Sequence, residues 1–239
     1  MLRRLPFLLL ALLGAGCASI SVLPTASKPE ARAPRVLYAA PFSFAGAAVN
    51  VDRKGKELAD FEAKLSAGMA RDIAERAAGI GLEGKQGIPD DVATKPRPAW
   101  LVKGRFIRVN QGSRALRAVV GLGTGGTKME AQVEVYDLSV PGSKPFLTFL
   151  TTGGSGAFPG GIFNPTVYTI VFWSATGLPQ GVTDDATRTC RMVIATVSQE
   201  MGKRGYLPEA QQKEPKALGG GADEAQKLKA RSATAPASP

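Results

Sequence analysis

The chain has 239 residues, 44% of them hydrophobic and 21% charged, which is enough to bury the core of one ordinary domain. Its formal net charge is +10, and it contains no histidine. The absence of histidine removes the usual general base and the commonest metal ligand, so we expect neither a metal site nor a cofactor.

The first residues have the pattern of a lipoprotein signal. Two arginines and a short apolar stretch at residues 5–13 precede small residues and Cys17. The apolar stretch is shorter than the roughly 20 residues that span a bilayer. The junction before Cys17 resembles a bacterial lipobox, with Gly14 where a leucine is usual. We expect removal of residues 1–16 and attachment of a lipid, such as palmitate, to Cys17; the alternative is ordinary signal cleavage.

The residue after Cys17 is Ala18 rather than Asp. By resemblance to lipoproteins of Gram-negative bacteria, this implies lipid anchoring in the outer membrane, facing the periplasm. The mature chain would carry a charge of about +8, because Arg3 and Arg4 leave with the signal. For an exported protein, anionic lipid or glycan is a more natural counter-charge than nucleic acid. If Cys17 is lipidated, Cys190 has no disulfide partner, and we expect it to be a small buried residue.

The first part of the mature chain is predicted as a tether followed by a strand and a helix. Residues 17–34 are rich in Ala, Ser and Pro, which is typical of a flexible linker. Residues 35–44 indicate a mostly buried strand that ends near Pro41. Residues 58–78 place apolar side chains three and four apart and predict a helix that ends at Gly79. The sequence does not decide whether residues 81–98 contain a short edge strand.

Three further segments alternate as strands do. Residues 100–109, 129–138 and 146–152 follow one another with short or glycine-rich connections, and we expect an antiparallel meander. In the middle segment Met129 and Val133 point to one face, and Glu130 and Glu134 to the other.

The last part of the domain is an apolar insertion and a second helix. Residues 153–182 are rich in Gly and aromatic residues, and either contact a membrane or partner or fold over the sheet as core. A helix follows, with Thr183 as the expected N-cap, Asp184 and Asp185 in its first turn, and Gly205 as its stop. Residues 207–239 are polar and of low complexity, and we expect a disordered tail.

These elements predict one α/β (α+β) domain at residues 35–206. Its single small sheet is expected to be mostly antiparallel, with two helices packed on one face. We expect the following side chains to make that contact: Phe61, Leu65, Ile73, Val193, Ile194 and Val197.

The connection between the first two strands of the meander is basic and rich in glycine. The glycines at 121, 123 and 125 lead into a strand and not a helix, so they predict a turn with positive φ angles and not a phosphate loop. Basic residues gather around this connection and form a possible contact surface for an anionic glycan, a lipid headgroup or an acidic protein, or else a solvated face: Arg105, Arg108, Arg114, Arg117 and Lys128.

The stretch from 109 to 138 resembles the lipoprotein family known as domain of unknown function 4410. The resemblance rests on the polar turn at 110–112, the basic segment with Arg114 and Arg117, the three glycines, and the strand that ends at Asp137. It extends over roughly residues 35–206 and implies a small α/β envelope lipoprotein. It brings no catalytic residue.

The sequence therefore predicts an outer-membrane lipoprotein that acts without catalysis, in envelope structure, assembly or binding. Its expected partners are the membrane, through the lipid, and an envelope protein or an anionic glycan. The alternative is a hydrolase of an envelope polymer that uses Asp or Glu. A concave pocket with two facing carboxylates would favour the hydrolase.

Overall fold

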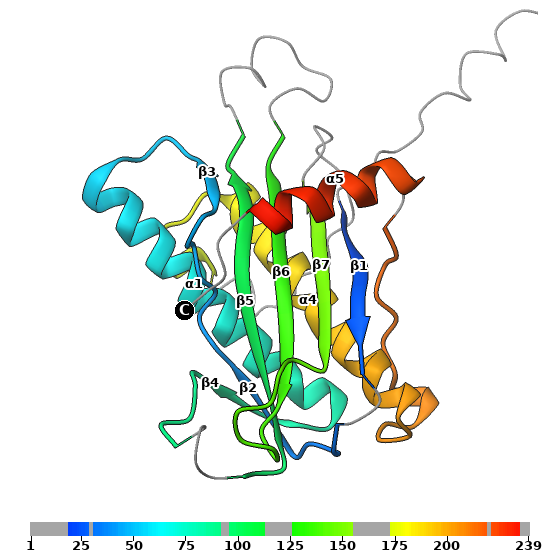
Figure 1. Cartoon of the computed structure of the whole chain (residues 1–239). Coiled ribbons are helices and arrows are strands. Elements are labelled where there is room, and N and C mark those ends of the chain that lie inside the picture. The colour runs from blue at the N-terminus through cyan, green and yellow to red at the C-terminus, as the bar shows by residue number, and fades with distance from the viewer. Residues whose placement is uncertain are drawn as a thin grey trace, which may run out of the picture.

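The computed structural model describes residues 19–28, 31–91, 96–112, 126–154, 173–218 and 221–234. Its centre is one open sheet of seven strands, most of them antiparallel to their neighbours. The strand order is β1-β7-β6-β5-β2-β4, and β3 pairs with the far part of β5. Figure 1 shows the sheet face-on. The predicted fold class, a mixed α/β domain with a mostly antiparallel sheet, is confirmed.

The strands have the following bounds: β1 Ser19–Ser27, β2 Val36–Ala39, β3 Ala48–Asn50, β4 Glu83–Gln86, β5 Ala99–Asn110, β6 Lys128–Asp137 and β7 Leu147–Gly154. The antiparallel meander that the sequence predicted is β5–β6–β7. The first predicted strand is β2, which ends before Pro41 and runs parallel to β5 and β4. A short edge strand, which the sequence left undecided, is present within residues 81–98 as β4.

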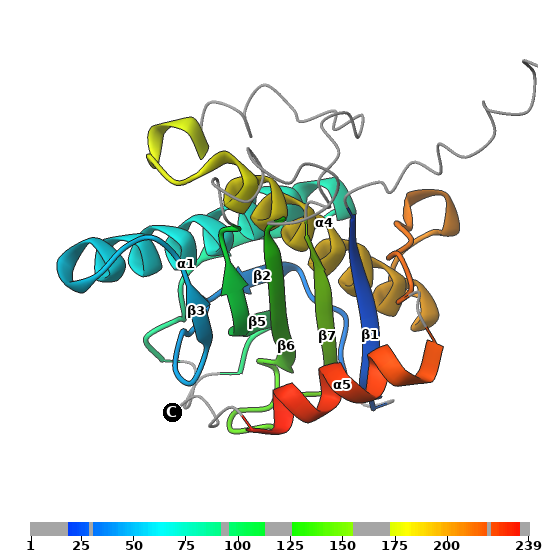
Figure 2. The ribbon, with the colours of Figure 1, turned by 90° about the horizontal axis from the view of Figure 1, so that it is seen from above.

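Helices cover both faces of the sheet. The long helices α1 (Gly55–Ala77) and α4 (Gln180–Lys203) lie side by side on one face, which we call the inner face. The shorter helix α5 (Gly221–Thr234) crosses the opposite, outer face (Figures 1 and 2). Two short 3-10 turns, η1 (Ala78–Ile80) and η2 (Glu209–Gln211), follow the long helices. Among the described residues, no helix combines the length and the hydrophobicity that crossing a bilayer requires.

The inner face carries the main core. Period-two alternation turns Met129 and Val133 of β6 toward the helices, where they are at most 1% exposed. The six side chains predicted to join the two helices to the sheet all belong to this core, which confirms that prediction. Cys190 is also buried there, as expected.

The helix ends differ from the prediction by a few residues. After α1 the chain continues through η1 to Gly81, whose φ of +76° only glycine adopts easily, so the stop is Gly81 and not Gly79. The helix α4 begins at Gln180, after Pro179, and Thr183 lies inside its first turn. The Thr183 hydroxyl donates to the Gln180 carbonyl (2.9 Å), so it does not cap the helix. Gly205 ends the helix region as predicted.

The expected tether is wrong for residues 19–27, which form β1 at one edge of the sheet. Ile20 and Val22 are 3% and 2% exposed, and the strand pairs with β7 from Ser19 to Ser27. The Pro and Ser content of the segment indicated a linker, although its apolar side chains alternate with the period of two that is typical of a strand. Pro24 is tolerated because the strand is at an edge and its register shifts between Pro24 and Ala26.

The expected disordered tail is also wrong for much of residues 207–239. Residues 216–218 lie along β1, where the Val22 amide donates to the Lys216 carbonyl (2.7 Å) and the Leu218 amide to the Val22 carbonyl (2.9 Å). The helix α5 then buries Leu228 completely against Ile107 and Leu150. Composition failed here because long-range contacts, and not local sequence, order the segment. Most of the apolar insertion, residues 155–172, lies outside the described residues.

Candidate functional site

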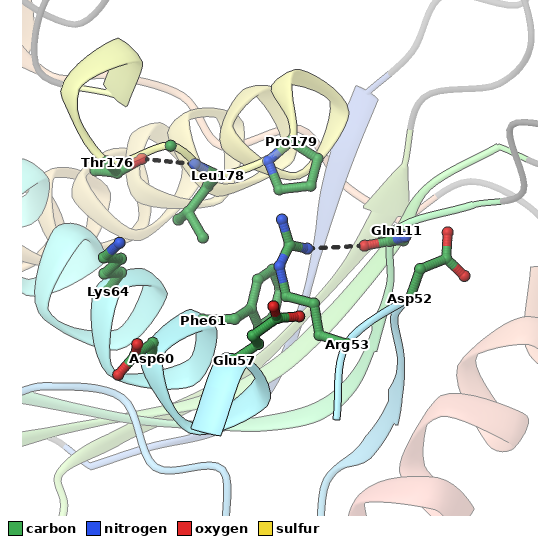
Figure 3. A pocket seen from close by; sticks show the side chains of 11 residues that line it. Asp52, Arg53, Glu57, Asp60, Phe61, Lys64, Gln111, Thr176, Leu178 and Pro179 are labelled. Carbon is green, nitrogen blue, oxygen red and sulfur yellow. Dashed lines mark hydrogen bonds between the residues drawn. The ribbon is translucent and has the colours of Figure 1, made fainter. Parts of the chain in front are cut away.

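A pocket of about 430 Å³ opens at the end of the sheet where β5 and β7 end (Figure 3). The start of α1, the chain just before α4 and the residue after β5 line it. It contains the following residues: Asp52, Arg53, Glu57, Asp60, Phe61, Lys64, Gln111, Thr176, Gly177, Leu178 and Pro179.

Arg53 points into the middle of this pocket. Its Nη1 donates to the side-chain oxygen of Gln111 (3.1 Å), and its guanidinium carbon lies 5.1 Å from the ring centroid of Phe61. Phe61 is 2% exposed, so the ring is a fixed support. The pairing of β3 with β5 brings these residues together, since Asn50 lies opposite Asn110 and its carbonyl accepts the Gln111 amide (3.1 Å). The result is a pre-oriented guanidinium with donors left over for a ligand.

The opposite wall is a turn held by its own hydrogen bonds. The Thr176 hydroxyl donates to the Trp173 carbonyl (2.7 Å) and accepts the Leu178 amide (3.2 Å). Leu178 packs against the main core, and its side chain faces Arg53 together with Pro179 (Figure 3). The pocket therefore combines two cationic side chains, Arg53 and Lys64, with an apolar wall, a combination that binds a carboxylate or phosphate attached to an apolar or sugar framework.

Three carboxylates surround the mouth of the pocket. Asp52, Glu57 and Asp60 are all exposed to solvent, and Glu57 and Asp60 share one face of α1. Within the described residues, no group of three or more Asp, Glu, His or Cys side chains is placed to hold a metal ion.

Three of the basic residues singled out in the sequence, Arg105, Arg108 and Lys128, lie elsewhere, on the outer face. Arg108 and Lys128 approach the carboxylate of Glu130, with nitrogen–oxygen distances of 3.9 and 3.8 Å. Glu130 is completely buried and is bound by both sides of the Arg231 guanidinium from α5 (2.8 and 2.9 Å). Three cations thus surround one buried carboxylate, and their predicted contact role stays a prediction.

Arg105 does not project into solvent with them. It is 9% exposed and lies beneath the last turn of α5. Arg114, Arg117, Cys17 and the three glycines of the predicted turn lie outside the described residues.

The sequence has two pairs of adjacent aspartates, Asp90–Asp91 and Asp184–Asp185, and one member of each pair has an ion-pair partner. Asp185 is 1% exposed, accepts a hydrogen bond from the Thr127 hydroxyl (2.5 Å) and pairs with Arg188 (3.1 Å). Burial raises the pKa of the Asp185 carboxyl to about 6, although both partners lower it. In the loop after β4, Asp91 pairs with Arg97. Neither aspartate pair lines the pocket of Figure 3.

Sequence reasoning did not find Arg53 and Gln111. Both lie in polar loop segments, 58 residues apart, and only the pairing of the three-residue strand β3 with β5 brings them together. An arginine two residues before an amphipathic helix was the one available signal, and it is too common to be specific.

Comparisons with known proteins give a family and a distant structural likeness. The family described as "Domain of unknown function (DUF4410)" matches residues 37–170, more than half of the chain. The PelC dodecamer from Paraburkholderia phytofirmans is 14% identical, with a TM-score of 0.33, over 72% of this chain and 96% of that one. A point variant of that dodecamer is 11% identical, with a TM-score of 0.34 and the same coverage. No curated protein matches the chain.

Proposed function

This chain belongs to the DUF4410 family, and from that premise we propose that it is an outer-membrane lipoprotein, anchored through Cys17, that binds an envelope partner and performs no catalysis. The N-terminal signal pattern before Cys17 supports the anchoring. The contacts of Arg53 support the binding role.

The observation that best supports a binding role is the position of the Arg53 guanidinium in the pocket of Figure 3. Gln111 holds it from one side and the Phe61 ring supports it, so little side-chain entropy is lost when a ligand binds. A fixed arginine with unused donors recognises a carboxylate or phosphate through two parallel hydrogen bonds. Arginine beside apolar surface is also the composition typical of protein-binding hot spots. We assign this pocket to an acidic side chain of an envelope protein.

The hydrolase remains the second candidate because carboxylates and a cleft occur together here. Glu57 and Asp60 lie one helical turn apart at the mouth of the pocket. Their exposure to solvent argues against the role of general acid. The two candidates differ in what they do to an envelope polymer.

Site-specific photo-crosslinking in the native cell tests the binding role. A photoreactive residue at Lys64, at the pocket, should give a discrete crosslinked product, and the same residue at exposed Lys144, in the β6–β7 turn, should not. Arg53→Gln should remove the Lys64 product while leaving the protein folded, because Arg53 is only partly buried. Equal products at both positions, or a product that is unchanged by Arg53→Gln, would contradict a pocket-specific partner.

The hydrolase is tested with purified envelope glycan. We expect the protein to release no soluble fragments during prolonged incubation. Release by the unmodified protein that Asp60→Asn abolishes would establish catalysis and overturn the proposal. Anchoring is tested separately with Cys17→Ser, which should abolish palmitate labelling and release the protein from the membrane fraction; unchanged labelling would show that Cys17 is not the lipid site.

A further inference from the structure

The outer face of the sheet is hollowed beside α5. A groove of about 960 Å³ lies over β5 and β6, and its lining includes Lys103, Arg105, Glu134 and Tyr136 from the strands. Lys229 and neighbouring residues of α5 form part of its rim. This volume is near the upper end of the range of about 300–1,000 Å³ that is usual for ligand sites. The groove is separate from the pocket of Figure 3 and shares no lining residue with it.

One buried donor in this groove lacks a partner. The Nη2 of Arg105 donates to the Ser232 carbonyl (2.5 Å) and to the Gln132 side-chain oxygen (2.7 Å). Its Nη1 is buried and has no hydrogen-bond partner among the described residues. A buried donor without a hydrogen bond costs about 1–3 kcal/mol of folding free energy, and more when the group is charged. Burial also lowers the pKa of the Arg105 guanidinium, which is the signature of a cation held without enough anionic contact.

The charged side chains around the groove also carry a net positive charge. Lys103, Arg105 and Lys229 carry three positive charges, and Glu134 supplies one negative charge. Both oxygens of Glu134 are already engaged by neutral donors, the Tyr136 hydroxyl (2.5 Å) and the Gln132 amide (3.0 Å). In the described part of the chain, no carboxylate lies within ion-pair distance of Lys103 or Lys229. The groove therefore attracts an anion from outside.

A fixed aromatic ring lies beside these cations. Tyr136 is half-buried, its hydroxyl is held by Glu134, and the Lys103 ammonium lies 5.6 Å from its ring centroid. Hydroxyl groups of Ser43 and Thr148 also line the groove. An oriented aromatic ring offers an apolar surface to the C–H face of a sugar, and the surrounding hydroxyls can exchange hydrogen bonds with its hydroxyls.

We propose that this groove binds a segment of an acidic, carboxylate-bearing glycan, with Arg105 and Lys103 facing the carboxylates and Tyr136 beneath a sugar ring. The choice of a glycan rests on the proposed function, because an envelope lipoprotein meets such polymers. The groove itself is a second site, independent of the Arg53 pocket.

Calorimetric titration of the purified full chain in detergent tests the site. The probe is hexagalacturonate, and the control probe is the same hexamer with its carboxylates methyl-esterified. We expect binding of the acidic hexamer and at least tenfold weaker binding of the ester. Lys103→Gln should weaken binding of the acidic hexamer tenfold or more, and Lys144→Gln, which removes the same charge from an exposed turn outside the groove, should leave it unchanged.

Arg105→Gln should also weaken binding, and its unfolding curve shows whether the fold survives the loss of a buried group. If Arg105→Gln does not fold, Lys103→Gln still tests the site, because Lys103 is only partly buried. Equal loss in Lys103→Gln and Lys144→Gln, equal binding of the ester, or no binding of the acidic hexamer would each overturn the glycan site. Lys103-dependent binding to phosphatidylglycerol vesicles without binding of the hexamer would assign the groove to a lipid headgroup instead. None of these failures affects the Arg53 crosslink or the Cys17 anchor.

Discussion

The two faces of the sheet are built from the same strands but bury different kinds of side chain. On the inner face, β6 presents Met129 and Val133 to the apolar sides of two long helices. On the outer face, the alternate residues Glu130 and Glu134 meet arginine, hydroxyl and amide groups. Apolar burial needs only volume and shape, whereas buried charges need specific partners. The inner face therefore holds the fold together, and the outer face has the chemistry to recognise a ligand.

The helices on the two faces differ in the same way. Most residues of α4 are buried, including Val193, Ile194 and Val197. Among the described residues of α5, only Leu228 and Ser232 are buried. A helix of 14 residues is marginal alone, so α5 depends on its few contacts with the sheet. We expect α5 to detach without unfolding the domain, and α4 not to.

The largest effect should come from a charge on the inner face. Val193→Asp places a carboxylate in the main core with no partner, which should cost about 4 kcal/mol or more and unfold the domain. Val140→Asp is the control, because Val140 is 50% exposed. Urea unfolding followed by circular dichroism measures both. An unchanged midpoint for Val193→Asp would show that the inner face is not the principal core.

A smaller and local effect should follow from Leu228→Ala on the outer face. Removing the one buried apolar side chain of α5 should weaken its docking by about 2 kcal/mol. Hydrogen exchange should accelerate roughly 30-fold in α5 and stay unchanged in β5 and β6. If the strands lose protection together with the helix, α5 is part of the cooperative core and the contrast between the faces fails.

A pH-dependent effect should distinguish Asp185, a buried carboxylate on the inner side of the sheet. Its pKa is raised to about 6 in the folded protein from 3.8, so the folded state holds the proton more tightly. The stability that this proton gives is present below about pH 4 and is lost as the pH rises through 6, by on the order of 3 kcal/mol. Asp185→Asn cannot titrate, and its stability relative to the unmodified protein should increase over that window. Parallel stability curves from pH 4 to 7 would contradict this assignment.

The smallest effect should come from Arg231→Lys. Lysine keeps the charge opposite Glu130 but replaces a two-pronged contact with a single one, which should weaken docking of α5 by about 1 kcal/mol. Lys227→Arg, at an exposed position of the same helix, should have no effect. The readout is again hydrogen exchange in α5. A loss as large as that of Leu228→Ala would mean that the ion pair, and not the leucine, fixes the helix.

The inner face could be predicted from the sequence because its signals are local. The period of three and four in α1 and of two in β6 each point to one face, and hydrophobic side chains at those positions need no specific partner. The meander, both long helices and the buried Cys190 were therefore predicted. Helix ends were displaced by a few residues because Pro179 and η1 act through backbone geometry.

The outer face and the Arg53 pocket could not be predicted in the same way. The contact between Arg231 and Glu130 joins residues 101 apart, and neither residue type indicates the other. Gly84 of β4 shows the same limit: a Cβ there would lie 1.7 Å from the Ala74 carbonyl oxygen, a close approach of two backbones that no local pattern reveals. Arg105 was identified, but as part of an exposed basic surface and not as a buried group.

The start of β1 has a mechanical consequence. Ser19 already pairs with Gly154, so two steps of chain separate Cys17 from the rigid sheet. Two residues reach at most about 7 Å. With a lipid on Cys17, the domain would stand directly on the bilayer, unable to swing outward or to search the periplasm. Its height would be set by the strands, and the 12 residues of β5 measure roughly 40 Å. A ligand beyond that height would have to be brought down to the protein, and a long inserted spacer after Cys17 would change which ligands it meets without changing either site.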